Sequence, residues 1–375
     1  MVTSKFFTLR LKNEMNKTKK IRIGNIYIGG GEPVRVQSMT KTDTRDWRAT
    51  SRQINELADA GCEIIRVAVP DMEATKVISK IKTNIKIPLV ADIHFDWRLA
   101  VEAINQGADK IRINPGNIGS KENISKIIAA AKKRKIPIRI GVNAGSLKIL
   151  KGSDRWLKMS SQKRAEQMVK ELCEYIKIFE DMKFRELVIS LKANDVRTTV
   201  LANRIYSKKF NYPVHLGITE AGTEFSGLVK SSVALGILLG EGIGDTIRVS
   251  LTADPKEEVK AGWEILKALG LRKRGVEIIS CPTCGRCEIN LIKIVHQLEE
   301  KLSTLNSQLS TQQLRVAVMG CVVNGPGEAR DADIGIAAGK GFGLLFKKGK
   351  IVKKIPQDKL INEILKEIKN VQKEI

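Results

Sequence analysis

One unit repeats over the first 270 residues: a short run of β-branched residues, a polar turn, and a stretch with helical periodicity. Strands that alternate with helices form parallel sheets. The run occurs eight times, which is typical of a closed (β/α)8 TIM-type barrel. The predicted strands are 33–39, 64–69, 88–93, 110–115, 138–143, 187–192, 213–218 and 246–251. An open doubly wound sheet is the alternative, but the glycine-rich turn that usually follows its first strand is absent.

The rest of the chain lacks this repeat and predicts a second domain. We expect an N-terminal extension over 1–20, the barrel over 21–270 and a smaller α+β domain over 271–375. The longest apolar run, 227–240, is interrupted by Lys230 and is shorter than the roughly 18 residues of a membrane helix. The N-terminus also lacks the apolar core of a signal peptide. We therefore expect a cytoplasmic protein.

Polar side chains lie at or near the ends of nearly all the predicted strands, where the active site of such a barrel is found. They are Gln37, Arg66, Asp92, His94, Arg112, Asn114, Arg139, Asn143, Lys192, Asn194, Glu220, Arg248 and Ser250. Five of these residues are cations. A single arginine in a strand is usually an edge residue, but five cations at one barrel mouth repel one another unless an anion offsets them. Arginine forks and lysine charges both bind phosphate oxygens. The sequence therefore predicts a multiply charged ligand such as a diphosphate.

The overall charge is strongly positive, with 65 Lys and Arg against 41 Asp and Glu, a net charge of +24. Such a charge favours acidic partners, although solvated lysines of a basic proteome also produce it. The basic residues are scattered and do not interleave with aromatics, which argues against a nucleic-acid surface.

Asp92 and Glu220 are candidates to orient the cations or move protons. His94 and His215 lack a metal-binding pattern, so we expect hydrogen-bonding roles for them.

Six cysteines are present: Cys62, Cys173, Cys281, Cys284, Cys287 and Cys321. Three of them form C-x-x-C-x-x-C, which in a cytosolic chain predicts metal binding rather than disulfides. Both zinc and an iron–sulfur cluster fit such thiolates. A zinc ribbon usually pairs two C-x-x-C knuckles, so the isolated Cys321 favours iron and sulfur. Glu328 follows Cys321 across a glycine-rich turn, from which its carboxylate, a harder and weaker ligand than thiolate, can reach a metal held there.

Segments along most of the chain resemble those of the 4-hydroxy-3-methylbut-2-enyl diphosphate synthases, a family of the methylerythritol phosphate pathway. They are VRVQSMTKTDT (34–44), GCEIIRVAVP (61–70), PLVADIHFD (88–96), KIRINPGNIG (110–119), RIGVNAGSL (139–147), HLGITEAG (215–222), ISCPTCGR (279–286) and GCVVNGPGEA (320–329). The length fits the compact two-domain bacterial type.

This resemblance implies a specific reaction and cofactor. The family converts 2-C-methyl-D-erythritol 2,4-cyclodiphosphate into 4-hydroxy-3-methylbut-2-enyl diphosphate, using two electrons from flavodoxin or ferredoxin. It carries a 4Fe–4S cluster held by three cysteines and a glutamate. The glutamate-bound iron receives the substrate oxygen. On this chain those ligands fall on Cys281, Cys284, Cys321 and Glu328. The family works as a homodimer, in which the barrel of one subunit faces the cluster domain of the other.

The residue roles expected from these arguments are as follows. Glu328 and Glu220 are catalytic, with Glu220 as the candidate proton donor. The expected substrate-binding residues are Arg66, Asp92, His94, Arg112, Asn114, Arg139, Asn143, Lys192, Arg248 and Ser250. Cys287 departs from the family pattern and competes with Glu328 as fourth ligand, but a four-thiolate cluster would leave no easily displaced ligand.

Two rival functions are compatible with parts of the sequence. One is a barrel enzyme for a pterin or another phosphorylated metabolite, with a zinc or structural cluster domain. The other, suggested by the net charge, is a nucleic-acid-binding protein with a metal module. We expect neither a nucleic-acid nor a membrane partner.

Overall fold

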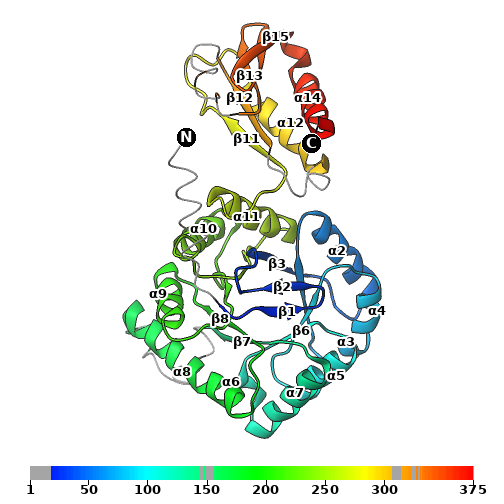
Figure 1. The fold of residues 1–375 in the computed structure, drawn as a ribbon, viewed down its shortest axis with the longest axis vertical. Helices are drawn as coiled ribbons and strands as arrows, with labels where there is room; N and C mark the ends of the chain where they lie inside the picture. Colours follow the sequence, from blue (N-terminus) through cyan, green and yellow to red (C-terminus); the bar gives the residue numbers. More distant parts are fainter. Residues whose placement is uncertain are drawn as a thin grey trace. The chain divides into compact units, whose positions relative to one another are not determined.

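The computed structural model describes residues 18–143, 147, 156, 158–305, 314–321, 327, 330 and 332–374. The chain forms two compact units, Met1–Arg272 and Lys273–Ile375. Figure 1 shows a ring of strands and helices in the first unit and a smaller sheet with helices in the second. The sequence placed the division two residues earlier.

The first unit is a barrel of eight parallel strands, which confirms the predicted fold class. The neighbour order is β8-β7-β6-β5-β4-β3-β10-β9. A bridge between Ile189 and Val214 joins β8 to the segment before β9 and closes the ring. The strands are β3 (Arg35–Met39), β4 (Ile64–Ala68), β5 (Leu89–Asp92), β6 (Lys110–Ile113), β7 (Ile138–Asn143), β8 (Leu187–Lys192), β9 (His215–Leu216) and β10 (Thr246–Ile247).

Helices connect the strands around the outside of the ring (Figure 1). They are α2 (Trp47–Asp59), α3 (Met72–Lys76), α4 (Ile78–Thr83), α5 (Trp97–Asn105), α6 (Pro115–Ile118), α7 (Lys121–Arg134), α8 (Ser161–Asp181), α9 (Val196–Ser207), α10 (Glu224–Gly240) and α11 (Pro255–Ala268). Most of them begin at a side chain that accepts a hydrogen bond from a first-turn amide, as N-cap preferences predict. These caps include Asp46, Asp96, Ser120, Ser160, Asp195 and Asp254.

An antiparallel hairpin of β1 (Ile21–Ile23) and β2 (Ile26–Ile28) closes the N-terminal end of the barrel. Its isoleucines pack against residues at the starts of the strands. The cluster comprises Ile21, Ile23 and Ile28 from the hairpin with Ile64, Val90 and Val188 from the barrel. The hairpin therefore covers this end of the barrel with apolar side chains.

The second unit is a five-stranded sheet covered by two long helices. The strands are β11 (Val276–Ser280), β12 (Leu314–Met319), β13 (Ile334–Gly339), β14 (Phe342–Lys347) and β15 (Lys350–Pro356), and they neighbour one another in that order. The first three are parallel and the last two antiparallel. Residues of α12 (Leu291–Leu305) and α14 (Leu360–Glu374) join one apolar core with the sheet. A short 3-10 helix, η3 (Gln357–Lys359), precedes α14. Within the described residues, no helix is long and apolar enough to cross a membrane.

Candidate active site

A polar cavity of about 230 Å³ lies at the C-terminal ends of the barrel strands. Its described lining residues are Met39, Arg66, Asp92, His94, Arg112, Arg139, Asn143, Ser190, Lys192, Ile218, Thr219, Arg248 and Ser250. All the substrate-binding residues expected from the sequence are among them, with the exception of Asn114. The structure therefore brings together five cations from five different strands or strand ends.

Asp92 lies among these cations and contributes a carboxylate to the described lining of the cavity. Arg112 Nη1 donates a 2.9 Å hydrogen bond to Asp92 Oδ1, and Arg66 Nε lies 3.6 Å from Asp92 Oδ2. Burial alone would raise the pKa of Asp92, but the charges of Arg66 and Arg112 and a hydrogen bond from His94 hold it well below its usual range. Burial lowers the pKa of Arg66 to about 10.

Arg139 and Lys192 are buried cations of the lining for which the described residues provide no carboxylate partner. Arg139 is almost fully buried, and its Nε and Nη1 atoms have no hydrogen-bond partner among the described residues. Burial, reinforced by the charges of neighbouring arginines, holds the pKa values of Arg139 and Lys192 well below their usual range. Buried polar groups are normally paired. An anion that accepts hydrogen bonds from these two side chains would pair the unpartnered nitrogens of Arg139 and balance the buried positive charge of both residues.

Gly217 makes room for Lys192 at the end of β9. A Cβ atom at residue 217 would lie 2.7 Å from Lys192 Nζ and would also clash with the backbone of Arg248. The φ angle of Gly217 is +154°, which side chains rarely adopt. Strand β9 is only two residues long, shorter than the predicted 213–218, and it ends immediately before Gly217.

The other polar residues at the strand ends occupy different positions. Asn114 is buried and accepts a hydrogen bond from Gly116 N, which caps α6. Glu220 is exposed beyond β9, does not line the cavity, and has a φ of +53°. Gln37 is buried in the barrel, and Asn194 is exposed. His215 Nδ1 lies 2.8 Å from Thr246 Oγ1 within the barrel, the kind of hydrogen-bonding role expected for it.

Sequence reasoning did not single out three residues that shape this site. Met39 Sδ lies 2.8 Å from Arg66 Nη2. Glu258, buried on α11, lies 3.5 Å from Arg248 Nη2 and accepts a hydrogen bond from Leu251 N at 3.0 Å. Lys110 is fully buried on β6, and its Nζ has no described partner. The alternation in the sequence KIR placed Lys110 on the same face as Arg112, which was an available signal.

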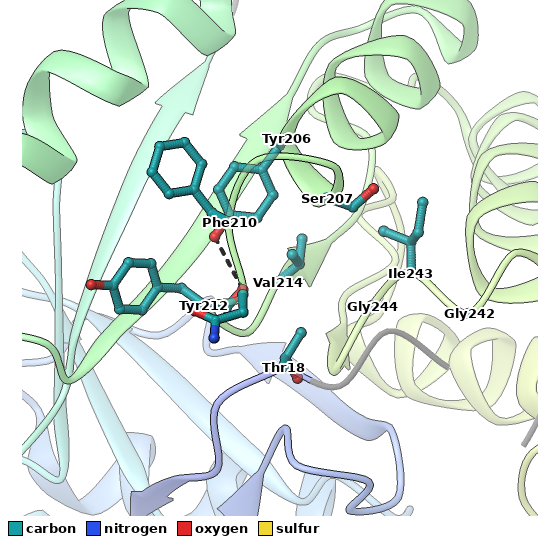
Figure 2. Close-up of a pocket in the computed structure, with 10 residues that line it drawn as sticks. Thr18, Tyr206, Ser207, Phe210, Tyr212, Val214, Gly242, Ile243 and Gly244 are labelled. Atoms are coloured by element: carbon teal, nitrogen blue, oxygen red, sulfur yellow. Dashed lines mark hydrogen bonds between the residues drawn. The ribbon is translucent and has the colours of Figure 1, made fainter. Parts of the chain in front are cut away.

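A second cavity, of about 150 Å³, lies where the chain enters β9 and β10. Figure 2 shows Tyr206, Phe210 and Tyr212 around it, with the Tyr206 hydroxyl donating to the Tyr212 carbonyl at 3.1 Å. Its described lining is aromatic, aliphatic and small, with no Lys, Arg, Asp or Glu. The chemistry predicted from the sequence therefore belongs to the other cavity.

The cysteines of the second unit lie at the ends of two neighbouring parallel strands. Cys281 follows β11, and Cys321 follows β12 by two residues. Gly320 N donates to Cys281 Sγ at 3.3 Å, which is the kind of contact that stabilises a thiolate. Cys284 is exposed, and Glu328 lies outside the described residues. The thiols fit an iron–sulfur cluster in kind, although no described group of three potential metal ligands is preassembled.

The fold and these features define a class: a two-unit protein with a barrel whose cavity is lined by five cations, and a second unit that carries thiols. A family model described as "GcpE TIM-barrel domain" matches residues 18–263, and one described as "GcpE protein C-terminal domain" matches residues 277–370. The chain belongs to the GcpE family, whose members are iron–sulfur enzymes.

Curated relatives match along nearly their whole length. A protein of Clostridium acetobutylicum named 4-hydroxy-3-methylbut-2-en-1-yl diphosphate synthase (flavodoxin) is 54% identical over 357 residues, covering 95% of this chain and 99% of the relative. A protein of the same name from Caldicellulosiruptor saccharolyticus is 55% identical over 356 residues, covering 95% and 99%. These matches support the first function predicted from the sequence and not the pterin alternative.

A solved structure resembles the barrel in fold. Dihydropteroate synthase from Stenotrophomonas maltophilia aligns with a TM-score of 0.50 at 14% identity, covering 67% of this chain and 99% of that one. This likeness concerns the barrel fold alone.

Proposed function

We propose that the protein converts 2-C-methyl-D-erythritol 2,4-cyclodiphosphate into 4-hydroxy-3-methylbut-2-enyl diphosphate. The reaction opens the cyclic diphosphate with two electrons and proton uptake, and one substrate oxygen leaves as water. The observation that carries the proposal is the cavity with five cations from five different strands or strand ends, in a chain whose curated relatives carry this name. The two unpartnered nitrogens of buried Arg139 support an anionic ligand.

The barrel residues would bind and polarise the diphosphate. Arg112, Arg139 and Lys192 approach the same cavity from neighbouring strands β6, β7 and β8. Preorganised cations stabilise the charge that develops on a departing phosphate oxygen, without having to reorganise during the reaction. The same residues therefore serve binding and ring opening. Four further lining residues would form hydrogen bonds to the ligand: His94, Asn143, Arg248 and Ser250.

Glu220 is the proposed donor of a proton to the substrate oxygen that leaves as water. It follows β9 on the same side of the barrel as the cavity. Its φ of +53° is uncommon for a residue with a side chain. Such strain often marks a functional position.

We further propose a 4Fe–4S cluster held by Cys281, Cys284, Cys321 and Glu328. When bound, the cluster would supply the two electrons one at a time. The position of Cys281 and Cys321 at the ends of adjacent strands supports this ligand set. A flavodoxin is the proposed electron donor, as the relatives' names indicate, with ferredoxin as the alternative. Both carriers are acidic, which suits a net charge of +24. Free thiols of this kind persist in a reducing cytoplasm.

A homodimer is also proposed, formed through the outer face of α10. The residues that define this face are Phe225, Val229, Val233 and Ile237, which are 79%, 47%, 47% and 37% exposed. Their spacing of four residues places them in one stripe. The glycines at 236 and 240 have no described atom within 4 Å of where a Cβ would lie, so another helix can approach closely there.

A second copy of this chain fits the α10 face better than an acidic partner. The stripe carries no charge, whereas the chain as a whole has a net charge of +24. Two copies repel each other where their surfaces are basic, so they can associate most readily through an uncharged apolar patch. An acidic carrier would gain nothing from this patch and would bind the basic surface instead.

Anaerobic turnover of the cyclodiphosphate tests the proposed function. Protein reconstituted with iron and sulfide would be assayed with a strong chemical reductant. The expected product is the linear diphosphate, formed by the wild type and not by Cys281→Ser. Binding of the cyclodiphosphate, measured separately, should persist in Cys281→Ser at reduced affinity, because the five cations of the barrel are unchanged. No product from fully loaded wild-type protein would contradict the proposal.

A further inference from the structure

Cys287 has no role in the proposed function, yet its sulfur lies beside that of Cys281. The segment folds back because Cys287 N donates to the Cys284 carbonyl at 2.9 Å, closing a turn. Cys281 and Cys287 are both partly buried and pack against the core of the second unit. Cys284, between them in sequence, is exposed.

Gly320 shows how close the two sulfurs are. A Cβ atom at residue 320 would clash with Cys287 Sγ and would lie 3.5 Å from Cys281 Sγ. Both sulfurs therefore border one space that a single methyl group would fill. Gly320 N also holds Cys281 Sγ through its 3.3 Å hydrogen bond. The described contacts join Cys281 to Cys287 through this space, and none brings Cys284 into it.

We propose that Cys281 and Cys287 form a reversible disulfide when the protein holds no cluster, leaving Cys284 as a free thiol. The oxidant is a small disulfide such as glutathione disulfide. The two cysteines lose two electrons and two protons as their S–S bond forms, and the oxidant is reduced to two thiols. Thiol–disulfide exchange reverses the step. The bond protects both sulfurs from oxidation to sulfinic acid, which is irreversible in most proteins.

The disulfide would control cluster assembly. This consequence rests on the proposed function, in which Cys281 is a cluster ligand. A sulfur in a disulfide cannot bind iron as a thiolate. Oxidised protein would therefore bind iron at Cys281 only after a thiol or sulfide had opened the bond.

Peptide mapping tests the disulfide without any cluster. Full-length protein would be stripped of metal with a chelator and a reductant, freed of both, equilibrated with glutathione disulfide, and treated with N-ethylmaleimide. Trypsin cleaves after Arg274, Arg286 and Lys293, so Cys281 and Cys284 fall in one peptide and Cys287 in the next. The expected product is the two peptides joined, with the maleimide on Cys284. A maleimide on Cys281, a loop within the first peptide, or no linkage would overturn the proposal.

Three variants separate geometry from chemistry. Cys284→Ser should keep the joined peptides, and Cys287→Ser should abolish them. Gly320→Ala keeps every thiol but places a methyl group in the shared space, so the joined fraction should fall about fivefold or more, since disulfide geometry is specific. The φ of Gly320 is not positive, so alanine is compatible with the backbone. If Gly320→Ala fails to fold, the two serine variants still decide the matter.

Iron uptake separates the disulfide from the proposed function. Oxidised wild-type protein, mixed with ferrous iron in the absence of sulfide and thiols, both of which open disulfides, should bind several-fold less iron than the same protein after reduction. Cys287→Ser should bind equally with and without prior reduction. Joined peptides together with undiminished iron uptake would keep the disulfide and refute the ligand role of Cys281. Equal uptake without joined peptides would overturn the further inference alone.

Discussion

Arg112 donates to Asp92 through a 2.9 Å hydrogen bond between two buried side chains at the mouth of the barrel. Asp92 also faces Arg66, so one carboxylate holds two guanidinium groups in place. Arg139 and Lys192 remain without such a partner in the described lining. The carboxylate of Asp92 thus balances part of the positive charge at the mouth, and the proposed anionic ligand would balance the rest.

Asp92→Asn should lower the free energy of unfolding by about 3 kcal/mol at pH 7, because removing one partner of a buried pair leaves uncompensated charge. The lowered pKa of Asp92 sets the pH dependence. Its stabilisation is fully present above the unfolded pKa of about 3.9 and is lost as the pH falls below that value. Urea unfolding at pH 7 and pH 3 measures this: the gap between wild type and variant should shrink at pH 3. A variant as stable as the wild type at pH 7 would contradict the assigned role.

Arg139→Met should change stability and binding in opposite directions. Without ligand, removing a buried guanidinium that lacks partners should raise the free energy of unfolding by about 1–3 kcal/mol. Affinity for inorganic diphosphate should fall roughly 10- to 100-fold, as expected for loss of charge-assisted hydrogen bonds. Calorimetric titration and urea unfolding give the two values. Arg185→Met, at a position outside the cavity lining, is the control. Weaker binding together with lower stability would indicate a structural role instead.

Lys110→Met should stabilise the protein at neutral pH. Burial, reinforced by the charges of Arg139 and Arg66, holds the pKa of Lys110 well below its usual range. At neutral pH the Lys110 side chain is protonated more readily in the unfolded chain than in the folded protein. The free energy of unfolding of the wild type therefore rises as the pH increases toward the unfolded pKa of about 10.4. The variant has no lysine at this position, so its free energy of unfolding lacks this dependence on pH. Urea unfolding should show a gain of about 1–3 kcal/mol at pH 7 that is smaller at pH 9. An equal gain at both values would mean that packing, not charge, is responsible.

The barrel could be predicted from the sequence because each strand contains a short run rich in β-branched residues. The run IIRVAV becomes β4 at Ile64–Ala68, and IRIGVN becomes β7 at Ile138–Asn143 without a change of bounds. The last two strands are shorter than predicted: β9 ends before Gly217, whose φ is +154°, and β10 ends before Arg248. The β-branched runs predict that a strand exists, but residue type does not show at which residue the pairing stops.

The lining of the cavity was predictable where polar side chains stand at or just beyond the end of a strand. Arg66, Arg112 and Lys192 follow from the rule that active sites of such barrels lie at strand ends. Glu258 does not, because it reaches Arg248 from α11 and its buried position is a tertiary property. The pairing of Cys287 with Cys281 also depends on a turn and on Gly320, neither of which the C-x-x-C-x-x-C spacing specifies.

Glu220→Gln should lower kcat while leaving KM nearly unchanged, because a proton donor acts in the transition state and the residue does not line the cavity. A fall of roughly 100-fold or more is expected for loss of a general acid. Steady-state kinetics on reconstituted protein would measure it. Glu224→Gln, another exposed glutamate four residues along the chain, is the control and should be nearly silent. A raised KM with unchanged kcat would assign Glu220 to substrate binding.

Val233→Lys should dissociate the proposed homodimer, since it places a charge at the centre of the uncharged α10 stripe. In a two-fold contact both subunits use the same patch, so the substitution buries two lysines per dimer among apolar side chains. Sedimentation at micromolar protein concentration should show a dimer for the wild type and a monomer for the variant. Val352→Lys makes the same change at an exposed valine of β15 and should leave the dimer intact. A wild-type monomer, or a Val233→Lys variant that sediments as the wild type does, would exclude the α10 face as the dimer contact.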